Sequence, residues 1–242
     1  MFGGIKALTD VNISLMSGEW LGIIGPNGSG KTTFLNVLSG VYRPSSGHVA
    51  VAGKNINALA PSKRGMHGIV RTFQHPQLAG SLTILENIMI GQRLSAGGDR
   101  INEAQLRKRA LAAAEQFGCA AHCHQLPDEA PYGVRKIAEI ARASIAHAKI
   151  LLLDEPAAGL SQDERSELKE ALRTFAKHQP ETGVFLIEHD VSFVAALCQN
   201  IVVLTSGAVL ASGPTEAILA DEAVKLAYLG RSGGKKGDGA RV

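Results

Sequence analysis

Short apolar runs alternate with stretches of helical periodicity along most of this chain. Leu21 to Ile24, Lys149 to Leu153 and Val184 to Ile187 have the length and composition of buried strands. Between the last two lies SQDERSELKEALRTFAKH (residues 161–178), which predicts an amphipathic helix with acidic residues early and basic residues late, as the helix dipole favours. This alternation predicts an α/β fold with a mainly parallel sheet.

Other segments of the chain depart from this alternation. SSGHVAVAG (residues 45–53) predicts a strand of an antiparallel hairpin, and Gly68 to Phe73 predicts another short strand. From about Leu82 to Phe117 the pattern is helical, broken by the loop SAGGD, which predicts a helical subdomain inserted at about residues 78–140. We therefore expect one domain over residues 1–230, followed by a disordered tail over residues 231–242.

Composition and charge narrow the class of protein. The chain is 45% hydrophobic and 19% charged with a net charge of +3, and it has no dense basic stripe, so a dedicated nucleic-acid binder is disfavoured. Its apolar runs, such as Ile201 to Leu204, fall far below the roughly 20 residues that span a bilayer. The first residues do not form a signal peptide pattern, and three cysteines without framework spacing suit a reducing cytoplasm. The cluster CAAHCH (residues 119–124) fits no structural zinc pattern, so a metal site is not favoured there.

The first candidate functional site is a glycine-rich segment. GPNGSGKT (residues 25–32) satisfies G-x-x-x-x-G-K-[ST] between a predicted strand and a predicted helix. Glycines let backbone N–H groups face a phosphate, and the helix N-terminus adds its positive end. Lys31 would reach the β- and γ-phosphates, and the Thr32 hydroxyl could ligate Mg²⁺. The predicted nucleotide-binding residues are Gly25, Pro26, Asn27, Gly28, Ser29, Gly30, Lys31, Thr32 and Thr33.

Two acids end the predicted strand at Leu153. Ligands bind at the carboxyl ends of parallel strands, so Asp154 and Glu155 should lie beside the phosphate loop. Asp154 is expected to hold Mg²⁺, and Glu155 to orient or deprotonate the attacking water. The alternative is a pair of solvated acids at the end of a strand.

With these motifs the chain resembles the ATP-binding cassette (ABC) family over nearly its whole length. ILLLDEPAAGLS (residues 150–161) resembles that family's Walker B and D-loop region. The resemblance implies that Gln74 is the Q-loop glutamine, which touches Mg²⁺ and the water, and that His189 is the switch histidine at the γ-phosphate. The expected catalytic residues are then Glu155, His189 and Gln74, the expected Mg²⁺ ligands are Thr32, Gln74 and Asp154, and the cofactors are ATP and Mg²⁺.

The family's signature sequence, LSGGQ, is altered here to APYGV (residues 130–134), followed by the predicted helix RKIAEIARASI (residues 135–145). The resemblance implies that Tyr132 and Gly133 contact ATP held by the opposite protomer. Pro131 replaces the serine whose hydroxyl would bond the phosphate, and proline also lacks an N–H. Ser161 stands where many family members have the D-loop aspartate. Both changes concern groups that act across a dimer.

Several short segments are typical of one subgroup, the ATPases of branched-chain amino acid importers: a proline–tyrosine–glycine signature, RTFQHPQL, DEPAAGL, IEHD and AYLG. The resemblance implies an ATP-dependent homodimer, or a heterodimer with a paralogous ATPase, working with two membrane permease subunits and indirectly with an external solute-binding protein. It places the chain at the cytoplasmic face of the cell membrane, with no nucleic acid. The alternatives are a low-turnover regulatory cassette and a non-transport ABC ATPase.

The start of the chain is shorter than the family's pattern. By spacing, Phe2 fits the aromatic residue that stacks on adenine, and the alternative is a frayed terminal residue. The strand that precedes this aromatic in the family is missing, which predicts a misassigned or truncated start.

Overall fold

The computed structural model describes residues 6–93 and 102–228, and its centre is a six-stranded sheet in the order β4-β5-β6-β1-β7-β8. The strands β4, β5, β6, β1 and β7 run parallel, and β8 pairs antiparallel with β7 at one edge. The predicted α/β fold with a mainly parallel sheet is confirmed. The strands are β1 Trp20–Ile24, β4 Ile69–Arg71, β5 Ile150–Asp154, β6 Gly183–Ile187, β7 Asn200–Thr205 and β8 Ala208–Pro214.

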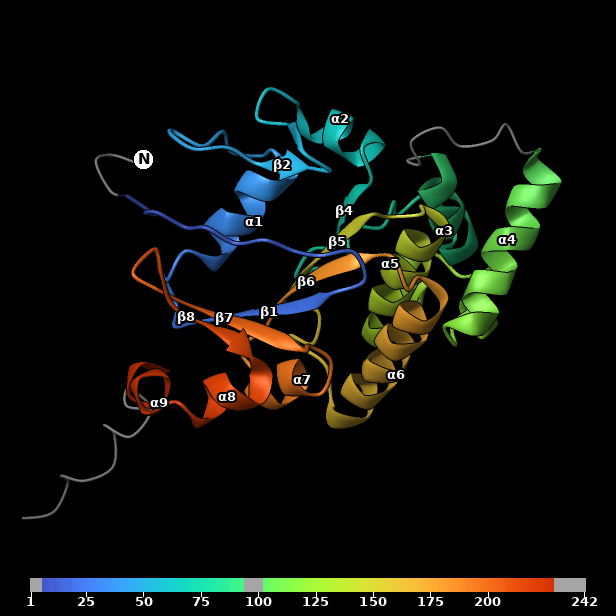
Figure 1. Ribbon diagram of the computed structural model, residues 1–242. Helices are drawn as coiled ribbons and strands as arrows, with labels where there is room; N and C mark the ends of the chain where they lie inside the picture. Colours follow the sequence, from blue (N-terminus) through green and yellow to red (C-terminus); the bar gives the residue numbers. More distant parts are fainter. Residues whose placement is uncertain (1–5, 94–101, 229–242) are drawn as a thin grey trace, which may run out of the picture.

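Helices cover both faces of this sheet (Figure 1). On β5, Leu152 packs in the cluster that contains Phe34 of α1, whereas Leu151 and Leu153 pack with the helices of the opposite face. Because both faces are buried, such strands are apolar at every position. The helices are α1 Lys31–Ser39, α2 Pro61–Met66, α3 Ile84–Arg93, α4 Glu103–Gln116, α5 Tyr132–Ile145, α6 Gln162–His178, α7 Val191–Ala195, α8 Thr215–Ala220 and α9 Glu222–Tyr228, with 3₁₀ turns at Ala120–His122 and Pro127–Glu129.

The helices α3, α4 and α5 pack together beside the sheet, on the side where α6 also lies (Figure 1). The helices α3 and α5 lie close together at Gly91. A Cβ atom at this position would come within 2.1 Å of the Arg142 carbonyl oxygen, so only glycine allows this approach. The predicted helical stretch from Leu82 to Phe117 thus contains α3 and α4. The domain bounds at residues 78–140 and 1–230 stay predictions, and the predicted tail lies outside the described residues.

The small hairpin predicted around residues 45–53 is present but short. It consists of β2 Ala50–Val51 and β3 Lys54–Asn55, which pair antiparallel. It lies near α1 and α2, apart from the main sheet (Figure 1). No helix in the described part of the chain is long and apolar enough to cross a membrane.

One pair of strands was missed by the sequence-based predictions, and the start of one helix needs correction. The antiparallel pair β7–β8 was not predicted, because β8 alternates between half-buried and exposed residues that include Ser212 and Gly213. The helix expected from Arg135 begins at Tyr132 instead. Pro131 is its N-cap residue with φ −52°, a value that proline adopts by itself and that suits a helix start.

Candidate functional site

The glycine-rich loop after β1 is held closely by its surroundings. Gly25 has φ +155°, and a Cβ atom there would lie 2.1 Å from the Leu204 carbonyl oxygen. Gly30 has φ +105°, and its Cβ would lie 2.8 Å from the Ala7 carbonyl oxygen. Only glycine fits at these two positions. The glycines allow the loop a backbone conformation in which its N–H groups can point inward. The N-terminus of α1 has no side-chain cap, which leaves its first N–H groups available to an anion.

This loop forms one wall of a cavity of about 440 Å³. The residues predicted at 27–33 line it, together with Glu155 and His189 from the ends of two other segments. Lys6 and Ala7 also line it, as do Ser206 and Gly207 from the turn between β7 and β8. These last four residues were not among the predicted site residues.

Lys31 is buried at the floor of the loop, with 6% of the residue exposed. Its Nζ atom donates to the Gly25 carbonyl oxygen at 2.7 Å and to the Pro26 carbonyl oxygen at 3.1 Å. Burial lowers the pKa of Lys31, while the carboxylates of Glu155 and Asp154 act in the opposite direction. The Ser29 hydroxyl is buried without a hydrogen-bond partner within the described structure. A bound phosphate would supply acceptors for this loop, so the residues fit an anionic nucleotide.

Asp154 ends β5 and is buried against Arg71, which was not among the predicted site residues. Arg71 Nη2 lies 2.7 Å from Asp154 Oδ2, and Arg71 Nη1 donates to Asn36 Oδ1 at 2.7 Å and to the Ser39 hydroxyl at 3.0 Å. Arg71 thereby joins the strand ends to α1. A charged residue in the apolar strand IVR was the signal that could have revealed it.

The predicted magnesium ligands offer oxygen donors of the kind that Mg²⁺ prefers: a hydroxyl from Thr32, a carboxylate from Asp154 and an amide oxygen from Gln74. Within the described ranges, no group of three or more His, Cys, Asp or Glu residues could hold a metal ion. Mg²⁺ usually takes one or two protein ligands together with substrate phosphates, so the donor set suits a metal brought with a nucleotide.

The three residues predicted to be catalytic lie together: Glu155 and His189 line the cavity, and Gln74 contacts Glu155. Gln74 Nε2 donates to Glu155 Oε2 at 3.0 Å, and His189 Nε2 lies 2.6 Å from Glu155 Oε1. Glu155 has φ +47°, a left-handed conformation that is strained for a residue with a side chain. Its N–H donates to the Ile187 carbonyl oxygen at 2.9 Å, which attaches it to the end of β6.

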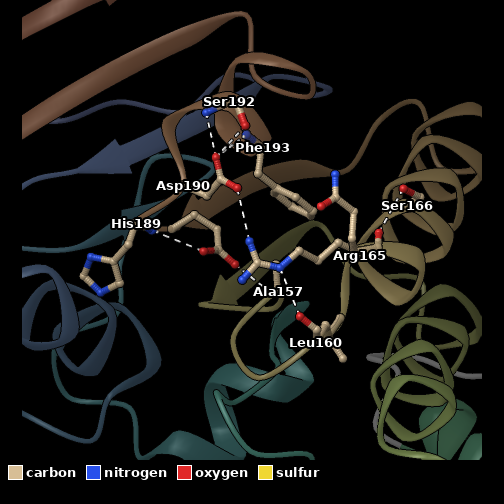
Figure 2. A network of polar contacts seen from close by, with 10 residues as sticks. Ala157, Leu160, Arg165, Ser166, His189, Asp190, Ser192 and Phe193 are labelled. Atoms are coloured by element: carbon tan, nitrogen blue, oxygen red, sulfur yellow. Dashed lines mark hydrogen bonds and ion pairs between the residues drawn. The ribbon is translucent and has the colours of Figure 1, made fainter.

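The residues on both sides of His189 attach it to the segment after Glu155. Glu188 is buried and accepts the Ala157 N–H at 2.6 Å, and burial raises the pKa of Glu188. Asp190 caps α7 and lies 3.2 Å from Arg165, whose Nε atom donates to the Leu160 carbonyl oxygen at 3.2 Å (Figure 2). Apart from the motif IEHD, nothing in the sequence had marked these residues.

The predicted signature residues do not line this cavity. The Tyr132 hydroxyl donates to the Gln74 carbonyl oxygen at 3.1 Å, and the Gly133 N–H donates to Glu164 Oε1 at 3.2 Å. Both residues belong to the first turn of α5. Phe2, predicted to stack on adenine, lies outside the described residues.

Ser161 has a local structural role at the start of α6. Its hydroxyl accepts the Glu164 N–H at 3.3 Å, and Glu164 Oε2 accepts the Ser161 N–H at 2.9 Å, which forms a capping box. In the cluster at residues 119–124, Cys119 and Cys123 are buried, and burial raises the pKa of Cys119 to about 12.

Comparison with known proteins agrees with this geometry. The family model described as ABC transporter matches residues 8–158. The chain is 35% identical to the high-affinity branched-chain amino acid transport ATP-binding protein LivG of Escherichia coli K12, over 96% of this chain and 94% of that protein. The chain belongs to the ABC transporter family. It is an ATP-binding cassette, and cassettes of this family hydrolyse ATP to drive transport.

Other relatives are similar to this cassette over comparable lengths. BraF of Pseudomonas aeruginosa, also a high-affinity branched-chain amino acid transport ATP-binding protein, is 34% identical over 96% of this chain and 94% of its own length. Among solved structures, the ADP conformation of MJ1267, an ATP-binding cassette of an ABC transporter, has a TM-score of 0.80 and 30% identity over 95% of this chain and 94% of its own. The dimeric cassette MJ0796 bound to ADP and Pi has a TM-score of 0.76 and 26% identity over 87% and 91% of the two chains.

Proposed function

We propose that this cassette powers the import of branched-chain amino acids, or of a related small polar solute. The proposal is supported by relatives named for branched-chain amino acid transport, which match nearly the whole chain at 34% and 35% identity. The observation that carries the hydrolytic role is the contact of Glu155 with both Gln74 and His189 at the edge of the phosphate cavity. The transported solute would bind other subunits.

The residues of the cavity would divide the work of hydrolysis. Lys31 and the loop N–H groups would hold the phosphates of ATP, and Gly25 and Gly30 allow the backbone to approach them. Thr32, Asp154 and Gln74 would hold Mg²⁺, which neutralises phosphate charge when bound. Glu155 would orient the attacking water and accept its proton, and its contacts with Gln74 and His189 restrict the directions that its carboxylate can take.

The proposed assembly has two cassettes with ATP between them. We assign Tyr132 and Gly133 to ATP held by the opposite protomer, because they stand at the position of the family's signature at the start of α5. The second protomer is another copy of this chain or a paralogous ATPase. Two membrane permease subunits and, indirectly, an external solute-binding protein complete the importer, which places the cassette at the cytoplasmic face of the cell membrane.

Glu155→Gln tests the hydrolytic role. The variant keeps the size of the side chain and removes the base, so steady-state phosphate release should fall at least about 100-fold while ATP still binds. The exposed Asp163→Asn serves as a control with the same chemical change. Turnover of the wild-type chain no higher than that of Glu155→Gln would support a low-turnover regulatory cassette instead.

The same variant tests the assembly. Glu155→Gln with saturating ATP should double its mass in light scattering, and ADP should leave it monomeric. A monomer under saturating ATP would rule out the homodimer, and mixing with the paralogous ATPase would then test the heterodimer. Uptake of labelled leucine by vesicles that contain the permeases and are supplied with the solute-binding protein, lost with Glu155→Gln, would test the proposed solute.

A further inference from the structure

Lys136 is a buried cation that the proposed roles in hydrolysis leave without a function. It lies one turn into α5, and only 4% of the residue is exposed. An ammonium group is costly to bury unless it is paired and hydrogen-bonded. The contacts of Lys136 therefore indicate why the protein keeps it there.

The two hydrogen bonds of Lys136 both end on residues of the proposed catalytic group. Its Nζ atom donates to the Gln74 carbonyl oxygen at 2.8 Å and to the Glu155 carbonyl oxygen at 3.3 Å. The side chains of these same two residues meet at 3.0 Å. One ammonium group thus binds the backbone of Gln74 and the backbone of Glu155, and the side chains of these two residues are hydrogen-bonded to each other.

The surroundings of Lys136 are negative, which favours a cation there. Burial lowers the pKa of Lys136, and the carboxylates of Glu188, Glu139, Glu155 and Asp154 act in the opposite direction. These carboxylates come from α5, from the end of β5 and from the segment after β6. A neutral side chain of similar length would neither balance this charge nor donate to both carbonyl oxygens.

We infer that Lys136 is a positioning residue for hydrolysis. It fixes the spacing of Gln74 and Glu155, and it attaches both to the helix whose first turn carries Tyr132 and Gly133. Tyr132 supports the same attachment through its hydroxyl, 3.1 Å from the Gln74 carbonyl oxygen. A movement of α5 would therefore displace the backbones of Gln74 and Glu155. The inference rests on the roles proposed for Gln74 and Glu155.

The first experiment compares Lys136→Met with Lys136→Arg in steady-state hydrolysis. Lys136→Met should lower kcat about 10- to 100-fold, since small misplacement of reacting groups has effects of this size. The KM for ATP should change less than about two-fold, because the phosphate loop belongs to other elements. Lys136→Arg keeps a cation with several donors and should recover part of the loss. Lys108→Met removes an exposed lysine on α4 and is the matched control, expected to leave kcat unchanged.

A double mutant separates positioning from general stability. If Lys136 acts through Gln74, Lys136→Met should lower kcat less in a Gln74→Ala background than in the wild type. If the fold-loss of kcat in the double mutant equals the product of the losses in the two single mutants, the inference is overturned. A kcat for Lys136→Met within two-fold of wild type would overturn it as well. Lys136→Gln, judged by the same criteria, replaces Lys136→Met if that variant does not fold.

The outcomes also distinguish this inference from the proposed function. If Glu155→Gln and Gln74→Ala leave hydrolysis unchanged, the proposed catalytic roles fail. If those two variants lower kcat and Lys136→Met does not, the roles stand and Lys136 is only a buried structural charge.

Discussion

Glu155 shows at the scale of one residue how a proposed catalytic group is held. Its φ of +47° is unusual for a residue with a Cβ atom and costs on the order of 1–3 kcal/mol. The conformation persists because neighbours fix both parts of the residue: Ile187 accepts the Glu155 N–H at 2.9 Å, while Gln74 and His189 contact the carboxylate oxygens. This backbone conformation thus directs the Glu155 side chain from the end of β5 towards the cavity.

This strain can be measured by comparing two substitutions that both remove the carboxylate. Glu155→Gly should be more stable than Glu155→Ala by about 1 kcal/mol, because glycine adopts a positive φ without steric cost. Urea unfolding of the two variants measures the difference. In ordinary backbone the alanine variant would be the more stable one, so that order would contradict a strained Glu155.

Glu188 should produce a pH dependence of stability with a defined sign. Burial raises its pKa in the folded state above the ordinary value of 4.5, so the folded protein holds this proton more tightly than the unfolded chain. The contribution of Glu188 to stability is therefore present below pH 4.5 and is lost as the pH rises through the folded pKa. Glutamine does not titrate, so the Tm of Glu188→Gln minus that of wild type should increase with pH above 4.5. Thermal unfolding at several pH values checks this, and a difference that falls with pH would contradict it.

Several buried charged residues were not identified from the sequence, for a physical reason. Sequence motifs mark residues at a phosphate or metal, such as Lys31 and Asp154, because that chemistry needs a fixed spacing. Arg71, Lys136 and Glu188 instead contact carbonyl oxygens, N–H groups or other side chains, and many spacings can satisfy such contacts. The roles of the predicted site residues stay predictions, although the structure brings Gln74, Glu155 and His189 together.

At the scale of elements, burial on both faces explains why β5 and β6 could be predicted. β5 and β6 read as continuous apolar runs because helices cover both sides, whereas β8 is an antiparallel edge strand with polar residues and was missed. The start of α5 was predicted three residues late, since proline and glycine there read as loop residues. Pro131 needs no hydrogen-bond partner at a helix start, which is why the helix can begin at Tyr132.

The start of α6 should depend on Ser161 as a cap. Ser161→Ala removes the hydroxyl that accepts the Glu164 N–H, so the free energy of unfolding should fall by about 1 kcal/mol. Ser161→Asp restores a strong capping group together with the family's D-loop residue, and its stability should be close to that of wild type. Chemical denaturation of both variants measures this, and an alanine variant as stable as wild type would show that the cap is unimportant.

At the scale of the whole molecule, two anions would compete for the Gly133 N–H in the proposed dimer: the Glu164 carboxylate of the same chain and the phosphate of ATP held by the partner. Glu164 Oε1 accepts the Gly133 N–H at 3.2 Å, which is the position assigned to the phosphate of the partner's ATP. A Cβ atom at Gly133 would lie 2.9 Å from the same carboxylate oxygen, so the space is already filled. Hydrogen bonds from Ser161, and also from Gly133, lower the pKa of Glu164, so its carboxylate is charged at neutral pH. The carboxylate must therefore move away as the two cassettes close.

Removing this charge should strengthen ATP-dependent association. In the Glu155→Gln background, Glu164→Gln should lower the dimer dissociation constant about two- to five-fold, as expected for a half-buried surface charge worth roughly 0.5–1 kcal/mol. Glutamine keeps an oxygen for the Ser161 N–H, so the capping box can remain. Asp163→Asn removes the same charge from an exposed position in the same turn and should have a smaller effect. Sedimentation with ATP measures all three chains. If Glu164→Gln weakens the dimer while Asp163→Asn does not, Glu164 supports closure, and its contact with Gly133 persists in the assembled state.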